Sequence, residues 1–401
     1  MTKGNDVYIV EAVRTPIGKI GGSLAQHYDD QLLAHALESL VKRVDGKVDA
    51  VDEVIVGQGK QSTDSPNVAR IGLLKAGWSE AIPAYTIHRQ CGSGLQAVNS
   101  GAQQIMSQLA DVVVAGGVES MSTAPYYLRG ARFGLGAGNG VLLDPNTESQ
   151  PRSQPKEQYG EFTMGFTAET LAEKYKISRE DQDRFAYSSQ KKAAHAIEEE
   201  RFQSQIAPVE VKQKKHTLLF SDDEHPRLAP IEKLATLQPV FKTGGTVTAG
   251  NSSGRNDGAA AILLTSQTGL TQLSVKPRAK IIAQAAAGVS PKEMGLGPVP
   301  ATAKALKQVG LTFKDIDVIE LNEAFSAQAL AVLQEWGMDM DDERLNPNGG
   351  AIALGHPIGA SGAILLTKAL YELERRQGTY ALITLCIAGG LGISTIIERV
   401  S

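Results

Sequence analysis

The sequence predicts an α/β protein in which sheets are buried between helices, and three observations support that prediction. Short runs rich in β-branched residues alternate with segments of helical periodicity along the 401 residues. The order of these segments in the first part of the chain recurs in the second part. Between the two parts, Ser122 to Gly245 breaks the rhythm, which indicates an inserted loop domain.

The expected strands are short apolar runs of the kind that α/β proteins bury on both faces. In chain order they are Val7–Val10, Val54–Val56, Val112–Ala115, Ala261–Leu264, Ile281–Ile282, Val318–Leu321 and Ala381–Leu385. Leu33, Leu37, Leu40, Val41 and Val44 share one helical face, so a helix should connect the first two strands.

The second part of the chain matches the first at a constant spacing, which favours an internal duplication. A shift of 265 positions carries Cys91 onto His356 and the segment 51–56 onto 316–321. The glycine pairs Gly116-Gly117 and Gly389-Gly390 are expected to be further counterparts. A functional site is therefore expected between the two halves.

The inserted segment has its own helix signals. Ser178 to Asp181 fits a capping box that opens a long polar helix reaching Phe202, and Thr167–Lys174 should form a shorter helix. Arg129 to Lys156 is rich in Gly, Pro, Ser and Asn and has no sustained periodicity, so a loop is expected there.

Composition argues against several classes of function. The chain has 40 Lys and Arg against 44 Asp and Glu, a net charge of −4, so nothing suggests a nucleic-acid partner. No run approaches the roughly 18 apolar residues of a membrane span, and the N-terminus lacks an apolar signal core. A soluble, cytoplasmic protein without a membrane partner is expected. Two cysteines and no close metal-ligand spacing predict reduced thiols and no catalytic metal.

Cys91 lies where a strand-like Tyr85–Ile87 gives way to the helical pattern of Leu95 to Leu109. A helix N-terminus favours the thiolate through its dipole and its free N–H groups, and the neighbouring Gly92 allows close approach. A buried structural cysteine is the alternative.

Three further residues occupy strand ends or glycine-rich turns, where α/β proteins place their sites. His356 stands among the glycines of 346–362, Cys386 follows the last expected strand, and Asn322 ends another. Backbone N–H groups in the turn after Cys386 could stabilise an oxyanion. Each residue alone could be structural, but together they suggest catalysis by a thiol nucleophile with a histidine base.

In this order the motifs resemble the thiolases, the family of acetyl-CoA acetyltransferases and 3-ketoacyl-CoA thiolases, over essentially the whole chain. The resemblance rests on Glu11–Pro16, Gln90–Leu95, Gly116–Ser122, Gly245–Asn251, Gly297–Pro300, Asn322–Phe325, Gly355–Pro357 and the Cys386 turn. It implies a duplicated five-layer α/β/α/β/α fold with an inserted loop domain over the CoA pocket. The expected parts are residues 1–121 with 246–272, the insertion 122–245, and residues 273–401. A homodimer or homotetramer is implied.

The resemblance also assigns catalytic roles. Cys91 is the nucleophile that accepts the acyl group, His356 the base that activates it, and Cys386 the acid/base for the α-proton of the second substrate. One oxyanion hole is expected from His356 and a water held by Asn322, and another from the backbone N–H groups of Cys91 and Ala388. Many members have glycine at the position of Ala388, so the alanine would be strained if the site needs a positive φ.

Contacts with CoA are implied for a second set of residues. Ser253 should bond the pantetheine arm, Met164 and Phe241 should pack near it, and Arg227 should lie by the adenine. Ala249 and Phe325 belong to the same expected set. Without the resemblance, these residues would be interpreted as ordinary packing or surface positions.

The function expected from the resemblance is reversible condensation of two acetyl-CoA to acetoacetyl-CoA and CoA through acetyl-Cys91. CoA thioesters are then substrates, and no metal or redox cofactor is needed. A degradative 3-ketoacyl-CoA thiolase of fatty-acid β-oxidation would use the same residues. Residues 129–163 depart from the short-chain pattern, which leaves chain length open. A decarboxylating β-ketoacyl synthase is disfavoured by Cys386, and a non-catalytic CoA-binding protein by the presence of all three groups.

Overall fold

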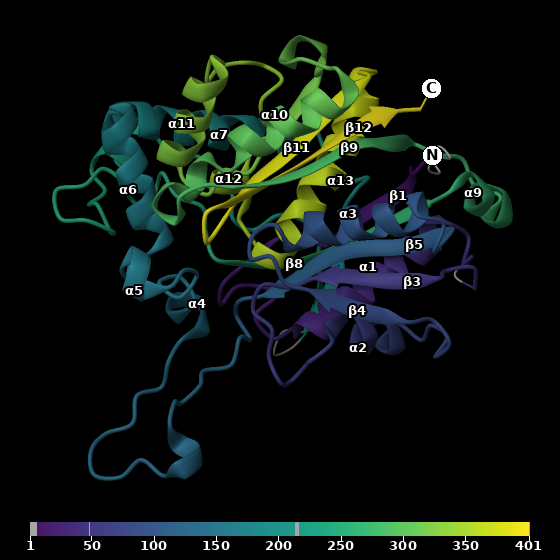
Figure 1. Cartoon of the computed structure of the whole chain (residues 1–401), viewed down its shortest axis with the longest axis horizontal. Coiled ribbons are helices and arrows are strands. Elements are labelled where there is room, and N and C mark those ends of the chain that lie inside the picture. Colours follow the sequence, from purple (N-terminus) through teal and green to yellow (C-terminus); the bar gives the residue numbers. More distant parts are fainter. Residues whose placement is uncertain (1–5, 48, 213–215, 401) are drawn as a thin grey trace.

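Helices and sheets alternate in five layers in the computed structural model, which describes residues 6–47, 49–212 and 216–400 (Figure 1). One half-sheet has the order β4-β3-β5-β8-β1 and the other has the order β9-β12-β11-β10. β1 and β9 pair only at Tyr8 and Ile9, where the half-sheets join. The strands are β1 (Tyr8–Arg14), β3 (Glu53–Gly57), β4 (Ala84–Ile87), β5 (Val112–Ser120), β8 (Asn256–Thr265), β9 (Ala279–Gly288), β10 (Val318–Leu321), β11 (Tyr380–Ile387) and β12 (Leu391–Arg399), with short β2 (Gly18–Lys19) beside β8.

Six of the seven expected strands fall within observed ones, the first, Val7–Val10, begins one residue before β1, and the α/β class is confirmed. Every residue of β5 and β8 is buried, because helices cover both faces of their sheet, and this explains their unbroken apolar runs. The additional strand β12 has no counterpart among the runs expected from the sequence.

Three helical layers enclose the two half-sheets. α3 (Ser93–Met106) and α13 (Ile358–Arg376) form the central layer and share one hydrophobic core with both half-sheets. α1 (Asp29–Arg43) and α2 (Val68–Lys75) cover the outer face of the first half-sheet. α10 (Pro298–Val309) and α11 (Ser326–Trp336) cover the second.

The strand pairing confirms the duplication. β3 pairs parallel with β5 as β10 does with β11, and antiparallel pairs β5–β8 and β11–β12 follow. The shift of 265 carries the first residue of α3, Ser93, onto the first residue of α13, Ile358. The expected pairing of Gly116-Gly117 with Gly389-Gly390 is wrong. When the two repeats are aligned by their strand registers, Gly116-Gly117 of β5 correspond to Thr384-Leu385 of β11. The shift changes because the chain from the start of the central helix to the corresponding strand position is three residues longer in the second half, from α13 to β11, than in the first, from α3 to β5.

The described residues of the segment 122–245, which leave out 213–215, contribute no strand to the central sheet. Ser178 caps α7 by accepting a hydrogen bond from the backbone N–H of Asp181, as expected, but the helix ends at Glu198 and not at Phe202. The division of the chain at 121, 245 and 272 stays a proposal. The segment contains α4 (Pro145–Glu148), α5 (Lys156–Tyr159), α6 (Met164–Tyr175), α7 (Arg179–Glu198), α8 (Ile231–Ala235), the hairpin β6 (Val209–Lys212) and β7 (Thr217–Phe220), and the 3-10 turn η1 (Ala131–Phe133).

Short elements complete the fold. They are α9 (Gln267–Leu273), α12 (Ala351–Leu354), η2 (Pro291–Leu296) and η3 (Phe313–Asp315). Within the described ranges, no helix is both long and apolar enough to cross a bilayer. Residues 1–5, which form part of the segment searched for a signal sequence, lie outside the described residues.

Candidate active site

The two central helices meet at their N-terminal ends, and glycine makes the approach possible. A Cβ added at Gly94 of α3 would lie 2.8 Å from the carbonyl oxygen of Gly359, within the first turn of α13. A Cβ at Gly362 would lie 2.7 Å from the Cβ of Leu95 and closer still to its backbone nitrogen. Cys91 lies two residues before α3, and His356 lies two residues before α13. Because the N-terminal ends of these helices meet, Cys91 and His356 come close together.

Cys91 lies on a tight strand-to-helix turn after β4. Gln90 adopts the left-handed backbone conformation with φ of 46°, which few residues other than glycine adopt. The Ser93 hydroxyl accepts from the backbone N–H of Arg89 at 2.8 Å and donates to the carbonyl of Gln90 at 2.6 Å. These bonds hold the elbow that presents the thiol.

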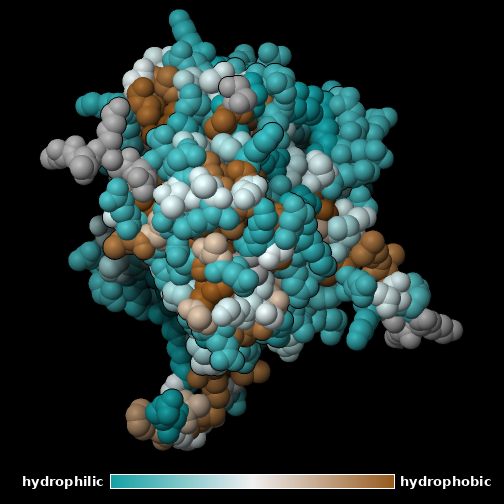
Figure 2. Space-filling model, turned by 90° about the vertical axis from the view of Figure 1, so that its right-hand side faces the viewer, coloured by the Kyte–Doolittle hydropathy of each residue, from teal (hydrophilic) through white to brown (hydrophobic). Residues whose placement is uncertain are grey.

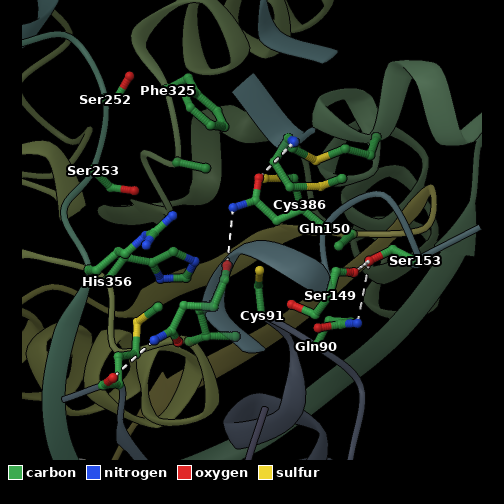
Figure 3. Close-up of a pocket in the computed structure, with 18 of the residues that line it drawn as sticks. Gln90, Cys91, Ser149, Gln150, Ser153, Ser252, Ser253, Phe325, His356 and Cys386 are labelled. Atoms are coloured by element: carbon green, nitrogen blue, oxygen red, sulfur yellow. Dashed lines mark hydrogen bonds between the residues drawn. The ribbon is translucent and has the colours of Figure 1, made fainter. Parts of the chain in front are cut away.

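A single pocket brings together most of the residues expected from the sequence, and Figure 3 shows Cys91 between His356 and Cys386. Its empty volume is about 870 Å³, mouth included. The rings of Phe241 and Phe325 meet edge-on in its wall, with centroids 5.8 Å apart. The predicted residues on the wall are Cys91, His356, Cys386, Ala388, Ser253, Met164, Phe241 and Phe325.

Asn322, Arg227 and Ala249 do not line this pocket. Arg227 and Ala249 are exposed. Asn322 is buried beside a smaller cavity whose wall includes Gly355 and Pro357, the two neighbours of His356. Among the described residues, none bonds either polar atom of the Asn322 side chain. Both polar atoms of this amide are thus without a partner among the described residues, and the role of holding a water stays a prediction.

Hydrogen bonding selects one tautomer of His356. The Ser361 hydroxyl donates its single proton to the carbonyl of Pro357 at 2.9 Å, so it accepts from His356 Nδ1 at 2.6 Å. Nδ1 then carries the ring proton, and Nε2 keeps a lone pair. Nε2 is buried and has no hydrogen-bond partner in the described structure, so it is available as a base.

Burial controls the ionisation of the three groups. It lowers the pKa of His356 to about 4, so the imidazole is neutral at neutral pH. It raises the pKa of Cys91, while the backbone N–H of Ala388 and the ammonium of Lys60 act in the opposite direction. Burial, and then the neighbouring Cys91, raise the pKa of Cys386 well above the usual thiol range. Both thiols are protonated at rest.

The backbone N–H of Ala388 lies near enough to Cys91 to lower the pKa of its thiol, and the role of this group as an oxyanion donor stays a prediction. The φ of Ala388 is not positive, and the left-handed residues of this turn are Gly389 and Gly390, with φ of 90° and 84°. The strain considered for alanine at this position therefore does not arise.

Several pocket residues have no sequence signal strong enough to identify them. Lys60 follows strand β3 and belongs to none of the motifs, and Gln90 belongs to the Gln90–Leu95 motif but was given no role there. Ser149, Gln150 and Ser153 come from the loop without periodicity. The other unpredicted wall residues are Met121, Asn146, Ser252, Gly254, Arg255, Met294, Ala324 and Ile358. Within the described ranges, no group of three or more His, Cys, Asp or Glu side chains is placed to hold a metal ion.

Family models match nearly the whole chain. The model for "Thiolase, N-terminal domain" matches residues 7–268 and that for "Thiolase, C-terminal domain" matches residues 275–399. With the duplicated fold and the paired thiols, these matches define the class as an acyltransferase enzyme. The chain belongs to the thiolase family.

Individual relatives have different names. An acetyl-CoA acetyltransferase of Syntrophomonas wolfei is 45% identical over 98% of this chain and 99% of its own length. A beta-ketoadipyl-CoA thiolase of Acinetobacter baylyi is 47% identical over the same shares. The crystal structure of human mitochondrial 3-ketoacyl-CoA thiolase superposes with a TM-score of 0.94 at 41% identity, covering 99% of both chains. The names agree on thiolase chemistry and differ in the acyl group.

Proposed function

We propose that this chain is an acetyl-CoA C-acetyltransferase that reversibly condenses two acetyl-CoA to acetoacetyl-CoA and CoA. The observation that carries the proposal is the meeting of Cys91, a neutral His356 with a free Nε2, and Cys386 in one pocket. Relatives named acetyl-CoA acetyltransferase support it.

In the first half-reaction Cys91 attacks the thioester carbon of acetyl-CoA. His356 Nε2 takes the thiol proton as the new carbon–sulfur bond forms. The bond to the CoA sulfur then breaks, and that sulfur takes the proton of Cys386 and leaves as CoA, so Cys386 becomes a thiolate while His356 keeps its new proton on Nε2. Backbone N–H groups of Cys91 and Ala388 stabilise the oxyanion between these steps.

In the second half-reaction Cys386, as thiolate, removes an α-proton from the second acetyl-CoA. The enolate oxygen accepts hydrogen bonds from the Nε2–H that His356 gained in the first half-reaction and from a water on Asn322. The α-carbon attacks the acetyl carbon, and the bond to Cys91 sulfur breaks, which releases acetoacetyl-CoA. The Cys91 sulfur takes back the proton from His356 Nε2, and Cys386 keeps the α-proton, so the resting state is restored. The raised pKa of Cys386 suits this role, because an α-proton of a thioester needs a base of high proton affinity.

CoA occupies the side of the pocket that carries Ser253. Ser253 bonds the pantetheine arm, Met164, Phe241 and Phe325 pack along it, and Ala249 and Arg227 lie nearer the solvent. Each half-reaction balances in atoms and electrons, so no metal or redox cofactor is part of the proposal.

A homo-oligomer is part of the proposal, as a dimer or tetramer in the cytoplasm. The loop that contains Phe133 and Leu142 projects from the body of the molecule and exposes hydrophobic side chains to solvent (Figure 2). Phe133 is 93% exposed and Leu142 is 68% exposed, which is unusual for side chains that stay in water. Light scattering on a purified sample gives the mass, and a monomer at micromolar concentration would rule out this part.

Thiolysis tests the function against the alternative of a 3-ketoacyl-CoA thiolase of β-oxidation. We expect a higher kcat/KM for acetoacetyl-CoA than for a medium-chain 3-ketoacyl-CoA at saturating CoA. Faster cleavage of the longer substrate would favour the alternative. Cys91→Ala should lose both the activity and the acetyl adduct that intact mass detects after treatment with acetyl-CoA. Cys386→Ala should keep part of the adduct and lose condensation. An adduct of equal yield in Cys91→Ala would overturn the assignment of the nucleophile.

A further inference from the structure

One wall of the pocket is polar where an acyl chain would extend beyond Cys91. Figure 3 shows Gln90, Ser149 and Ser153 on the side of Cys91 away from His356 and Ser253. Gln90 Nε2 donates to the Ser153 hydroxyl at 3.4 Å, and that hydroxyl donates to the Ser149 carbonyl at 2.9 Å. A hydrocarbon chain would gain little by displacing water from such a wall.

Lys60 supplies a buried positive charge to the same wall. Its residue is 8% exposed, it lines the pocket with Cys91, and its Nζ donates to the Ser149 hydroxyl. Among the described residues, no carboxylate lies within ion-pair distance of this ammonium. Glu119 and Asp144 act on it only through space.

Glu119 is committed elsewhere. Its carboxylate accepts from the backbone N–H groups of Gly59 at 3.0 Å, Lys60 at 2.9 Å and Gly359 at 2.7 Å. These bonds hold the loop after β3 against the start of α13 and leave the Lys60 side chain without an ion pair. Burying an ammonium without a partner is costly, so a partner carboxylate from a ligand would relieve that cost.

The space continues past Lys60. Lys60 and Ser149 also border a second, more open cavity whose wall includes His88 and Tyr127. Its other charged side chains, Arg152 and Glu148, pair with each other at 3.5 Å. The first pocket is lined by two cations, Lys60 and Arg255, and by no carboxylate from the described residues. Arg255 pairs with Asp144 at 3.5 Å, so Lys60 is the cation on this polar wall that has no carboxylate partner among the described residues.

We propose that Lys60 is a specificity-determining residue that pairs with a carboxylate at the far end of the acyl group. The enzyme then accepts 3-oxoacyl-CoA thioesters of dicarboxylic acids as well as acetoacetyl-CoA. This inference rests on the proposed function, since the acyl group must be carried by Cys91 for its far end to meet Lys60.

Matched substrates test the inference. The probes are 3-oxohexanedioyl-CoA and 3-oxohexanoyl-CoA, which share a chain length and differ in a terminal carboxylate or methyl group, with the seven- and eight-carbon pairs beside them. We expect the wild type to prefer a carboxylate-ended member in kcat/KM. Lys60→Met should lower that preference about 10- to 100-fold, or about 1.4–2.8 kcal/mol at 1.4 kcal/mol per tenfold. Lys60→Gln is the second variant.

The ratio of the two substrates separates recognition from a general effect on the Cys91 thiol, which would change both rates alike. Lys314→Met, which removes an exposed charge far along the chain in η3, should leave the ratio at the wild-type value. Preference of the wild type for every methyl-ended substrate overturns the inference, and so does a ratio that both Lys60 variants leave unchanged. If the wild type cleaves acetoacetyl-CoA but shows no carboxylate preference, only this inference fails. If it cleaves no substrate, the proposed function fails too.

Discussion

His356 owes its chemistry to its surroundings. The imidazole is buried, one nitrogen donates to Ser361, and the other keeps a lone pair in the pocket. A histidine in water would be partly charged near pH 6.5, whereas this one stays neutral well below that pH. The residue can thus accept a proton over the whole physiological range.

The acylation rate of Cys91 should therefore resist acid. A base works in its unprotonated form, which persists above its pKa, and burial lowers that pKa to about 4. We expect the rate of single-turnover acetylation to stay level as the pH falls from 7 to 5 and to decline only near 4. Quenched-flow mass spectrometry measures it. A decline centred near 6.5 would contradict the burial argument.

Ser361 is a positioning residue in this scheme. Ser361→Ala removes the acceptor of the Nδ1–H and frees the ring to adopt the other tautomer, so kcat should fall about tenfold or more. Ser361→Thr keeps the hydroxyl and should restore most of the loss. A merely structural role would lower the melting temperature without changing the pH profile of acylation, and that pair of measurements distinguishes the two.

At the scale of elements, the crossing of α3 and α13 carries the site. Leu95 packs its backbone against Gly362, so any side chain there would push the helices apart. The same contact brings together the N-terminal ends of α3, which follows Cys91, and of α13, which follows His356. A change that moves the two helices apart should therefore lower the stability of the protein and also disturb the geometry of the site.

Gly362→Ala should have two opposite effects on stability, one through helix propensity and one through packing against Leu95. Alanine favours a helix over glycine by about 1 kcal/mol, so α13 alone would be stabilised. The clash with Leu95 should outweigh this, and we expect a net loss of about 1–3 kcal/mol in urea unfolding. Gly288→Ala, whose added Cβ meets only the carbonyl of Gly390 at 3.9 Å, is the control and should change stability little. A stabilised Gly362→Ala would show that the helices can separate at no cost.

For the whole molecule, a buried ion pair joins the inserted segment to the central sheet. Arg14 of β1 and Asp223 form two hydrogen bonds, at 2.7 and 2.9 Å, and both side chains are fully buried. Asp223 also accepts from the backbone N–H of Ile17. The segment that contributes Met164 and Phe241 to the pocket is thereby anchored to the sheet.

Asp223→Asn should destabilise the protein by about 3–5 kcal/mol, because it leaves the Arg14 guanidinium buried without a countercharge. Adding Arg14→Met to it should recover part of the loss. Glu293→Gln breaks the exposed pair with Lys174 at 2.8 Å and should cost no more than about 1 kcal/mol. Denaturant titration measures all of these variants, and equal costs for the two single changes would contradict the role of burial.

Sequence patterns predicted the parts of this molecule that repeat or that are locally encoded. Buried strands such as β5 and the cap at Ser178 follow from local chemistry, and the spacing from Cys91 to His356 follows from the duplication. The polar wall was missed because Lys60 and Ser149 meet only in the folded chain. The counterpart of Gly116-Gly117 was misplaced because register depends on the length of chain before the strand, which a constant shift ignores.

The equivalence of Cys91 and His356 has an evolutionary consequence. They hold the same place in two copies of one unit, each two residues before a central helix. In an ancestor built from two identical units, the residue at this position would have lain beside the same residue of the other unit. Such a pair has two side chains of one kind, whereas this site has a thiol beside an imidazole. Fusing the units into one chain let each copy change alone, and this division of labour created an asymmetric pair at a symmetric crossing.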